Sequence, residues 1–185
     1  MIEDKLLILR FRQGRPEALR QVYDKYKVEL LRLAVVLLGD ATSGEDIVHD
    51  VFVSFAQTAD RIKLTGSLRN YLVTSVINRA RNYRRDGARH CETPLEEADL
   101  RSSLDRGPLQ WAILGEQLTL LSRALQGLPY EQREVISLRM EMDMTFRRIA
   151  ALQGASLNTV KGRYRYGVEK LRSVLNGKVE HEIRR

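Results

Sequence analysis

Near the carboxyl end of the chain, cationic and amide side chains recur at helical spacing. A helix that begins at Leu157 would bring Asn158, Lys161 and Arg165 onto one face. Lys and Arg can donate to the acceptors of guanine, and Asn can pair with adenine, so this face has the chemistry needed in the DNA major groove. Gly162 would let the groove wall approach closely. The expected contact residues are Asn158, Thr159, Lys161, Gly162, Arg165 and Tyr166.

A helix-turn-helix would position these side chains. Thr145 can cap a short helix over residues 146–153, Gly154 begins a turn, and Ser156 can cap the second helix. An ordinary helical hairpin with a solvated basic face would give a similar pattern and is the alternative. Two cations at the start of the first helix are expected to contact phosphates, Arg147 and Arg148.

A second group of cations and amides lies on an expected helix over residues 68–85. A protein can trap and stack unpaired bases on aromatic or planar cationic groups, and this helix would carry both kinds of group. Arginines suit phosphates, asparagines suit base edges, and Tyr71 and Tyr83 are interleaved among them. The alternative is a solvated face with both tyrosines partly in the core. The polar members are Arg69, Asn70, Asn78, Arg79, Arg81, Asn82 and Arg85.

A third group is acidic. Asp46, His49 and Asp50 fall within one helical turn, so a metal-dependent nuclease is an alternative to consider. Acidic residues near a helix start are favoured by the helix dipole in any case. The adjacent His90 and Cys91 lack companions at metal-ligand spacing. We therefore predict no catalytic residue, no metal and no cofactor, and a protein that is not an enzyme.

Composition and charge narrow the class of protein. The 185 residues carry a formal net charge of +7, which favours a polyanionic partner, either nucleic acid or an anionic membrane face. The single cysteine, Cys91, excludes an intrachain disulfide. The longest apolar run, residues 33–38, is too short to span a bilayer, and no signal-peptide pattern is present. We expect a cytoplasmic protein with no membrane partner.

The apolar periodicity is helical almost throughout. We predict an all-α fold of two small helical domains joined by a flexible linker, with the helix-turn-helix in the C-terminal domain. The expected parts are residues 1–87, an acidic linker at 88–107, and residues 108–185. We expect the third helix to start after Ser43, in an approximate capping box with Asp46. The other helices are expected at residues 3–13, 16–39, 68–85, 108–127, 129–142, 146–153 and 157–176.

The predicted core faces follow from the same periodicity. The third helix is expected to bury Ile47, Val48, Val51, Phe52 and Phe55. The fourth is expected to bury Leu68, Leu72, Val76 and Ala80, and the last helix Leu157, Val160, Tyr164, Val168, Leu171 and Leu175.

Two stretches resemble conserved regions of one protein family. Residues 45–52 are Glu-Asp-Ile-Val-His-Asp-Val-Phe, and residues 68–72 are followed by Asn78 and Arg85. Residues 158–163 are Asn-Thr-Val-Lys-Gly-Arg. These resemble the second and fourth regions of the extracytoplasmic-function (ECF) sigma factors of the sigma-70 family, in the right order and separation. The fourth-region resemblance also includes Leu128, Pro129, Arg133, Val135, Ile136, Leu138, Ile149, Ala150, Lys170, Leu171 and Arg172.

The resemblance implies a sigma factor that binds core RNA polymerase, directs initiation at promoter DNA and helps to open it. The acidic helix, through Glu45, Asp46, His49 and Asp50, would dock on the clamp of the largest polymerase subunit. The fourth helix and the loop before it would hold the minus-ten element. The implied minus-ten contacts are Lys63, Thr65, Ser67, Arg69, Asn70, Tyr71, Asn78, Arg81, Asn82 and Arg85.

The resemblance also implies a role for the C-terminal half. The second helix of the helix-turn-helix would bind the minus-thirty-five element as duplex, and the acidic linker would thread toward the active-site and RNA-exit channels. Members of the family are often restrained by an anti-sigma factor, so such a partner is expected too. The sequence departs from the family at Arg148, His49 and Tyr71, where Glu, Gln and Trp are usual. A two-domain helix-turn-helix regulator that binds duplex DNA without polymerase is the remaining alternative.

Overall fold

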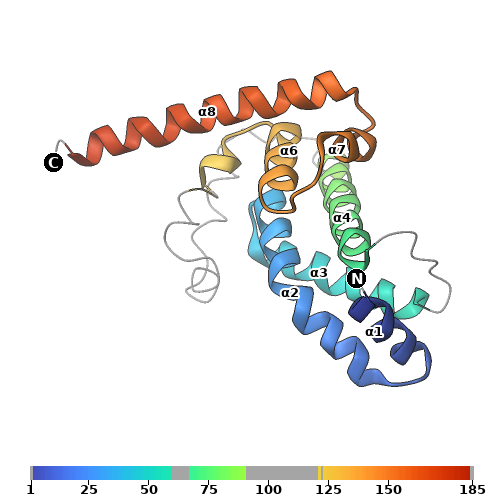
Figure 1. Cartoon of the computed structure of the whole chain (residues 1–185). Helices are drawn as coiled ribbons and strands as arrows, with labels where there is room; N and C mark the ends of the chain where they lie inside the picture. Colours follow the sequence, from blue (N-terminus) through green and yellow to red (C-terminus); the bar gives the residue numbers. More distant parts are fainter. Residues whose placement is uncertain (1, 60–66, 91–120, 122, 184–185) are drawn as a thin grey trace. The chain divides into compact units, whose positions relative to one another are not determined.

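The computed structural model describes residues 2–59, 67–90, 121 and 123–183. The chain divides into two compact units, Met1–Leu104 and Asp105–Arg185. Every element described is an α-helix, so the all-α prediction is confirmed (Figure 1). Among the residues described, no helix is both long enough and apolar enough to cross a membrane.

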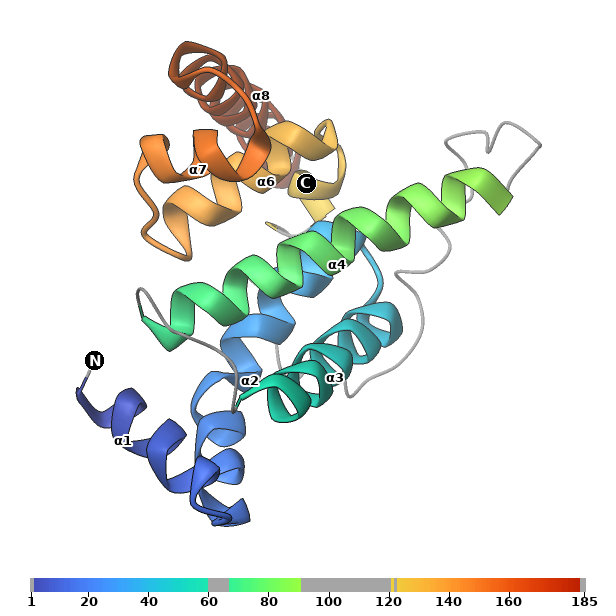
Figure 2. The same ribbon diagram turned by 90° about the vertical axis from the view of Figure 1, so that its right-hand side faces the viewer.

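The first unit consists of α1 (Ile2–Arg12), α2 (Pro16–Leu38), α3 (Ala41–Thr58) and α4 (Leu68–His90). Gly39, at φ 82°, ends α2 in the left-handed conformation that glycine adopts without strain. Figure 2 shows α4 lying across α2 and α3, and all three pack on one another. The core between them holds large, fully buried side chains, among them Leu30, Leu33, Val51, Phe55, Leu72 and Ile77.

The start of α3 corrects one prediction. The helix begins at Ala41, not after Ser43, because Asp40 is the N-cap and its side chain accepts a hydrogen bond from the Ser43 backbone N at 2.8 Å. The predicted buried face of α3 is confirmed, since all five apolar side chains named for it are buried. The acidic residues of interest therefore lie in the second and third turns, on the face that the core leaves exposed.

α4 begins as predicted, with the Ser67 hydroxyl accepting from the Asn70 backbone N at 3.2 Å. Its four predicted inward residues are all buried. The helix continues to His90, past Gly87 and into the segment expected as linker. The rest of that acidic segment, and most of the helix expected over residues 108–127, lie outside the described residues.

α1 is attached to the unit by a buried carboxylate. Asp4 accepts hydrogen bonds from Lys25 Nζ at 2.8 Å and from the Tyr26 hydroxyl at 2.9 Å. Burial alone would raise the pKa of Asp4, but these two hydrogen bonds, together with the positive charges of Lys25 and the N-terminus, outweigh it, and the pKa lies below the usual 3.8. Burial and the same hydrogen bond raise the pKa of Tyr26 to about 12. Arg12 Nε donates to the Ala59 carbonyl at the end of α3, 2.9 Å away, so α1 contacts both neighbours.

The second unit contains α6 (Tyr130–Met140), α7 (Phe146–Gln153) and α8 (Leu157–Ile183). The predicted helix-turn-helix is confirmed: Thr145 caps α7, Gly154 ends it at φ 59°, and the Ser156 hydroxyl accepts from Thr159 N at 3.0 Å. α8 extends beyond its expected end at residue 176. Of its predicted inward residues, Val160 and Leu171 are buried and the other four are half-buried.

Close helix packing in this unit depends on a glycine that the sequence analysis passed over. A Cβ at Gly167 would lie 2.6 Å from Cδ1 of Ile136 and 3.3 Å from Cβ of Gln132, both on α6. Because glycine has no side chain there, α8 can lie directly on α6. This contact holds α8 on its apolar side and leaves its opposite face open.

Candidate functional site

The exposed face of α8 carries the residues predicted to contact DNA. Lys161 and Arg165 are exposed, whereas Val160 is completely buried and Leu171 retains only 6% of its surface. A Cβ at Gly162 would meet no atom within 4 Å, so this position leaves room for an approaching surface. The exposed residues on this face are Asn158, Thr159, Lys161, Arg165 and Tyr166.

Arg165 is oriented by its neighbour. Its guanidinium carbon lies 4.9 Å from the centroid of the Tyr166 ring, and Nη2 donates to the Tyr166 hydroxyl at 3.1 Å. The tyrosine itself is 56% exposed. A planar cation stacked on an exposed ring offers both a hydrogen-bonding fork and an apolar surface, and both are useful at a base edge.

Two further cations project from the first turn of α7. Arg147 and Arg148 are both exposed, and the cap uses only the Arg148 backbone N, which donates to the Thr145 hydroxyl at 3.3 Å. Between them and the core, Phe146 contacts the Tyr164 ring with centroids 5.2 Å apart. The arginines therefore extend from a fixed helix start, where backbone N–H groups also favour an anion.

A hydrogen-bonded chain behind this face was missed by the sequence analysis. Arg163 donates to Gln153 Oε1 at 2.7 Å, and Gln153 Nε2 donates to Glu134 Oε1 at 3.1 Å. Glu134 is 1% exposed. A lone glutamate inside an amphipathic helix gives no sequence signal that it is buried. Arg163 follows the exposed Thr159 by one helical turn, so its inward orientation had no sequence signal either.

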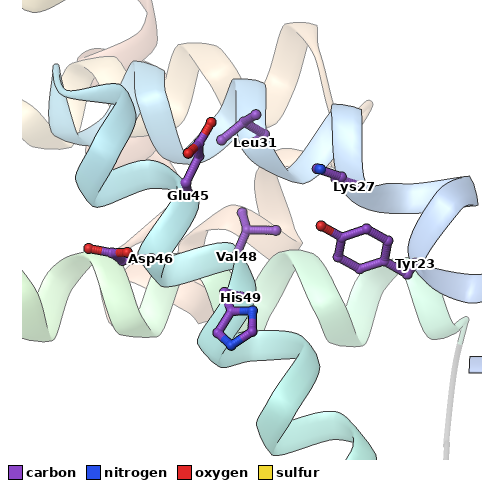
Figure 3. A pocket seen from close by; sticks show the side chains of 7 residues that line it. All are labelled: Tyr23, Lys27, Leu31, Glu45, Asp46, Val48 and His49. Atoms are coloured by element: carbon purple, nitrogen blue, oxygen red, sulfur yellow. The ribbon is translucent and has the colours of Figure 1, made fainter. Parts of the chain in front are cut away.

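On α3, Glu45, Asp46 and His49 are exposed and line one side of a pocket. Figure 3 shows the other wall, where Tyr23 and Lys27 project from α2. Leu31 and Val48 also line the pocket. The structure therefore brings the predicted docking residues beside side chains from another helix, which spacing along the sequence could not indicate.

The α2 wall of this pocket is cationic and aromatic. Lys27 Nζ lies 5.1 Å from the centroid of the Tyr23 ring. The Tyr23 side chain, through its hydrogen bond and its charge interaction, raises the pKa of Lys27. The pocket thus presents carboxylates on one wall and a retained ammonium on the other, which suits a partner surface of mixed charge.

The fourth predicted docking residue is engaged within the unit. Asp50 accepts from Arg79 Nη1 of α4 at 2.9 Å. This ion pair joins the acidic group of α3 to the basic group of α4, so the two groups partly neutralise each other. Both side chains remain solvent-accessible.

The predicted minus-ten residues of α4 fall into two groups. Arg69 is held by Glu29 of α2, with Nε to Oε1 at 2.8 Å, and Tyr71 is half-buried against Phe55, with ring centroids 6.2 Å apart. Asn70 and Arg81 are half-buried, whereas Asn78, Asn82 and Arg85 are exposed. Ser67 serves as the helix cap, and Lys63 and Thr65 lie outside the described residues.

Tyr83 lies farther along α4 than Tyr71 and differs from it. It is 54% exposed, and its hydroxyl is 2.9 Å from the Ser43 hydroxyl of α3. Of the two tyrosines, Tyr71 therefore lies partly in the core, and Tyr83 offers an accessible ring. Within the described part of the chain, no three His, Cys, Asp or Glu side chains group as a metal site would require.

Comparison with known proteins adds independent evidence. Residues 22–90 match the family model for sigma-70 region 2, and residues 124–173 match the model for sigma-70 region 4. The ECF RNA polymerase sigma factor RpoE of Cereibacter sphaeroides is 33% identical over 134 residues, covering 71% of this chain and 72% of that protein. The ECF RNA polymerase sigma-E factor of Escherichia coli is 24% identical, covering 100% and 98%.

Among solved structures, a similar fold occurs in the sigma factor RpoE of Bartonella quintana, determined in complex with the anti-sigma factor NepR. Its TM-score is 0.66 at 22% identity, covering 85% of this chain and 98% of that one. Together these matches show that the chain belongs to the ECF sigma factors of the sigma-70 family. It directs promoter-specific transcription. The family matches favour this function over that of a regulator that binds DNA without polymerase.

Proposed function

We propose that α7 and α8 bind the minus-thirty-five element as duplex DNA. The carrying observation is the division of α8 into a buried side at Val160 and an exposed side at Lys161 and Arg165. A recognition helix must turn its polar side chains outward while the rest of the motif holds its apolar side. Arg147 and Arg148 supply the phosphate contacts beside it.

In this proposal, α4 and the residues just before it bind the minus-ten element. The exposed Asn78, Asn82 and Arg85 suit base edges and phosphates of a strand leaving the duplex. Arg69 and Tyr71 support the helix through α2 and α3 as well as lying near that strand. These contacts can form only with separated strands, so they would stabilise the open promoter.

Core RNA polymerase docks on the exposed side of α3. Glu45, Asp46 and His49 form an accessible, mainly acidic surface with a pocket beside it, and charge complementarity favours a basic helix on the polymerase. Asp50 contributes at the edge, where it already pairs with Arg79.

The remaining proposals concern organisation and partners. The first 87 residues would form the docking and minus-ten domain, residues 88–107 an acidic linker, and residues 108–185 the minus-thirty-five domain. The protein would work in the cytoplasm with the polymerase and have no enzymatic activity of its own. An anti-sigma factor is a further partner, by analogy with the NepR-bound neighbour.

Run-off transcription tests this function. The purified chain is added to core RNA polymerase of the same organism on a library of promoter templates. We expect transcripts from a restricted promoter set, which disappear when the chain is omitted. If the chain binds duplex DNA but does not associate with core polymerase, the stand-alone regulator becomes the better hypothesis. If it cleaves the template in a chelator-sensitive way, the nuclease does.

A further inference from the structure

Helices α6, α7 and α8 of the second unit share one hydrogen-bonded chain, defined here as the Glu134–Gln153–Arg163 relay. Gln153 is the last residue of α7, and it joins Glu134 of α6 to Arg163 of α8. Gln153 Nε2 also donates to the Glu131 carbonyl at 3.2 Å. The relay therefore spans the turn whose geometry sets the angle between α7 and α8.

The relay has only one hydrogen-bonding direction. A carboxylate can only accept and a guanidinium can only donate, so the amide between them must turn its nitrogen to Glu134 and its oxygen to Arg163. Glu134 is almost fully buried, which makes an unsatisfied state costly. Gly154 follows directly in the left-handed conformation, so the backbone of the turn is fixed as well.

Arg163 lies at one edge of the face that carries the proposed DNA contacts, one helical turn after Thr159, but its side chain turns away toward α7. Its side chain is half-buried and points to Gln153. The Arg163 guanidinium therefore makes its hydrogen bond inside the helix-turn-helix, to Gln153.

We propose that the relay sets the angle at which α8 meets duplex DNA, and that Arg163 is a positioning residue, not a DNA contact. The inference rests on the proposed minus-thirty-five binding by α8 and adds the residues that orient it. Loss of the relay should misplace several base contacts together while leaving every phosphate-binding cation present.

The test uses the full chain in holoenzyme, on promoters from the library selection and on non-promoter duplex, over a range of salt concentrations. Gln153→Met removes the relay without changing charge, and Arg163→Ala removes its outer end. Each should lower promoter affinity about tenfold, as for a lost, partly buried hydrogen bond, at unchanged salt slope and unchanged non-promoter affinity. The double variant should be no worse than either single variant, because one interaction is lost.

Lys161→Ala is the matched control, because it removes one cation of the same helix and should lower the salt slope by about one. Arg163→Lys, which keeps a donor for Gln153, should retain most of the promoter affinity. If Arg163→Ala lowers the slope as Lys161→Ala does, or if Gln153→Met binds like wild type, the proposal is wrong.

A parallel fall in promoter affinity, non-promoter affinity and free energy of unfolding would reduce the relay to a purely structural role and overturn the proposal. If Lys161→Ala changes neither affinity nor slope, the failure lies instead with the proposed minus-thirty-five contact of α8.

Discussion

The two units use similar polar side chains in different ways. On α8, Lys161 extends from an exposed face and forms no ion pair with any residue that the structure describes. On α4, Arg69 is paired with Glu29, and Arg79 is paired with Asp50. The proposed duplex-binding surface is thus held from behind, through Gly167 and the relay, whereas the proposed opening surface is braced by some of its own predicted contact residues.

This difference has a physical basis. A major-groove helix meets a regular partner, so its side chains need only a rigid backbone beneath them. A surface that holds displaced bases must keep its shape while the DNA changes, and ion pairs between helices provide that shape. Substitutions of the exposed cations Lys161 and Arg165 of α8 should therefore affect binding alone, and several substitutions in α4 should affect binding and folding together.

The largest effect is expected on the duplex-binding side. The double variant Lys161→Ala/Arg165→Ala should lower holoenzyme affinity for the promoter about a hundredfold, since each base or phosphate contact contributes about 1–3 kcal/mol. Affinity for core polymerase and the free energy of unfolding should stay at wild-type values, because both side chains are exposed. Filter retention measures promoter binding, and fluorescence anisotropy measures core binding. Equal losses of promoter affinity and core affinity would contradict the separation of DNA binding from polymerase binding.

Charge reversal on α3 should give the opposite pattern. Asp46→Lys places a cation on the proposed docking surface and should weaken core binding about tenfold through like-charge repulsion. Asp50→Lys serves as the comparison, because it also breaks the pair with Arg79 and should lower stability as well. Unchanged core affinity for Asp46→Lys, measured by anisotropy, would remove α3 from the docking surface.

Arg69 and Glu29 separate support from DNA contact in α4. Arg69→Ala and Glu29→Gln should each lower the free energy of unfolding by about 1 kcal/mol, because the pair is partly buried. Only Arg69→Ala should also slow open-complex formation, followed by permanganate reactivity of the minus-ten thymines. If Glu29→Gln slows opening equally, Arg69 acts through the fold alone.

Two glycines of α8 form a matched pair. Gly162→Ala should raise the free energy of unfolding by about 0.5–1 kcal/mol through helix propensity while weakening promoter binding, because the added methyl faces the proposed groove wall. Gly167→Ala should lower the free energy of unfolding by about 1 kcal/mol, since its Cβ would collide with Ile136. Denaturant titration and promoter binding of both variants check this; a Gly162→Ala protein that binds normally would show that close approach is unnecessary.

The smallest effect concerns acid stability. Because the folded-state pKa of Asp4 is lowered, its contribution is fully present above about pH 4 and is lost as the pH falls below that value. Asp4→Asn should therefore cost about 1 kcal/mol at pH 7 and less at pH 3. Thermal unfolding at both pH values measures this, with Glu17→Gln as an exposed control on α2; equal losses at pH 3 and pH 7 would contradict the assignment.

Local sequence signals predicted much of the second unit. Thr145, Gly154 and Ser156 gave the bounds of α7 and the start of α8, because capping and turn preferences act over a few residues. The apolar period also separated Val160 from Lys161. The same local rules failed at Ser43, since Asp40 offered a better-placed cap three residues earlier.

Contacts between distant residues could not be predicted in this way. The pairs Arg69–Glu29 and Arg79–Asp50, and the wall that Tyr23 and Lys27 add to the α3 pocket, depend on how helices cross. A basic residue has the same sequence signature whether it faces DNA or an acidic neighbour. The acidic and basic groups named from the sequence therefore include members, Asp50, Arg69 and Arg79, that are paired within the unit.

The central claim is that α8 binds duplex DNA and α4 captures a separated strand. It is tested most directly by comparing two kinds of promoter template: fully duplex, and already separated across the minus-ten element. In single-round run-off assays, an Asn78→Ala/Asn82→Ala variant should be impaired on duplex templates and largely restored on pre-opened ones. The Lys161→Ala/Arg165→Ala variant should keep its defect on both. If pre-opening restores the α8 variant and leaves the α4 variant impaired, the assignment of duplex binding to one unit and strand capture to the other is contradicted.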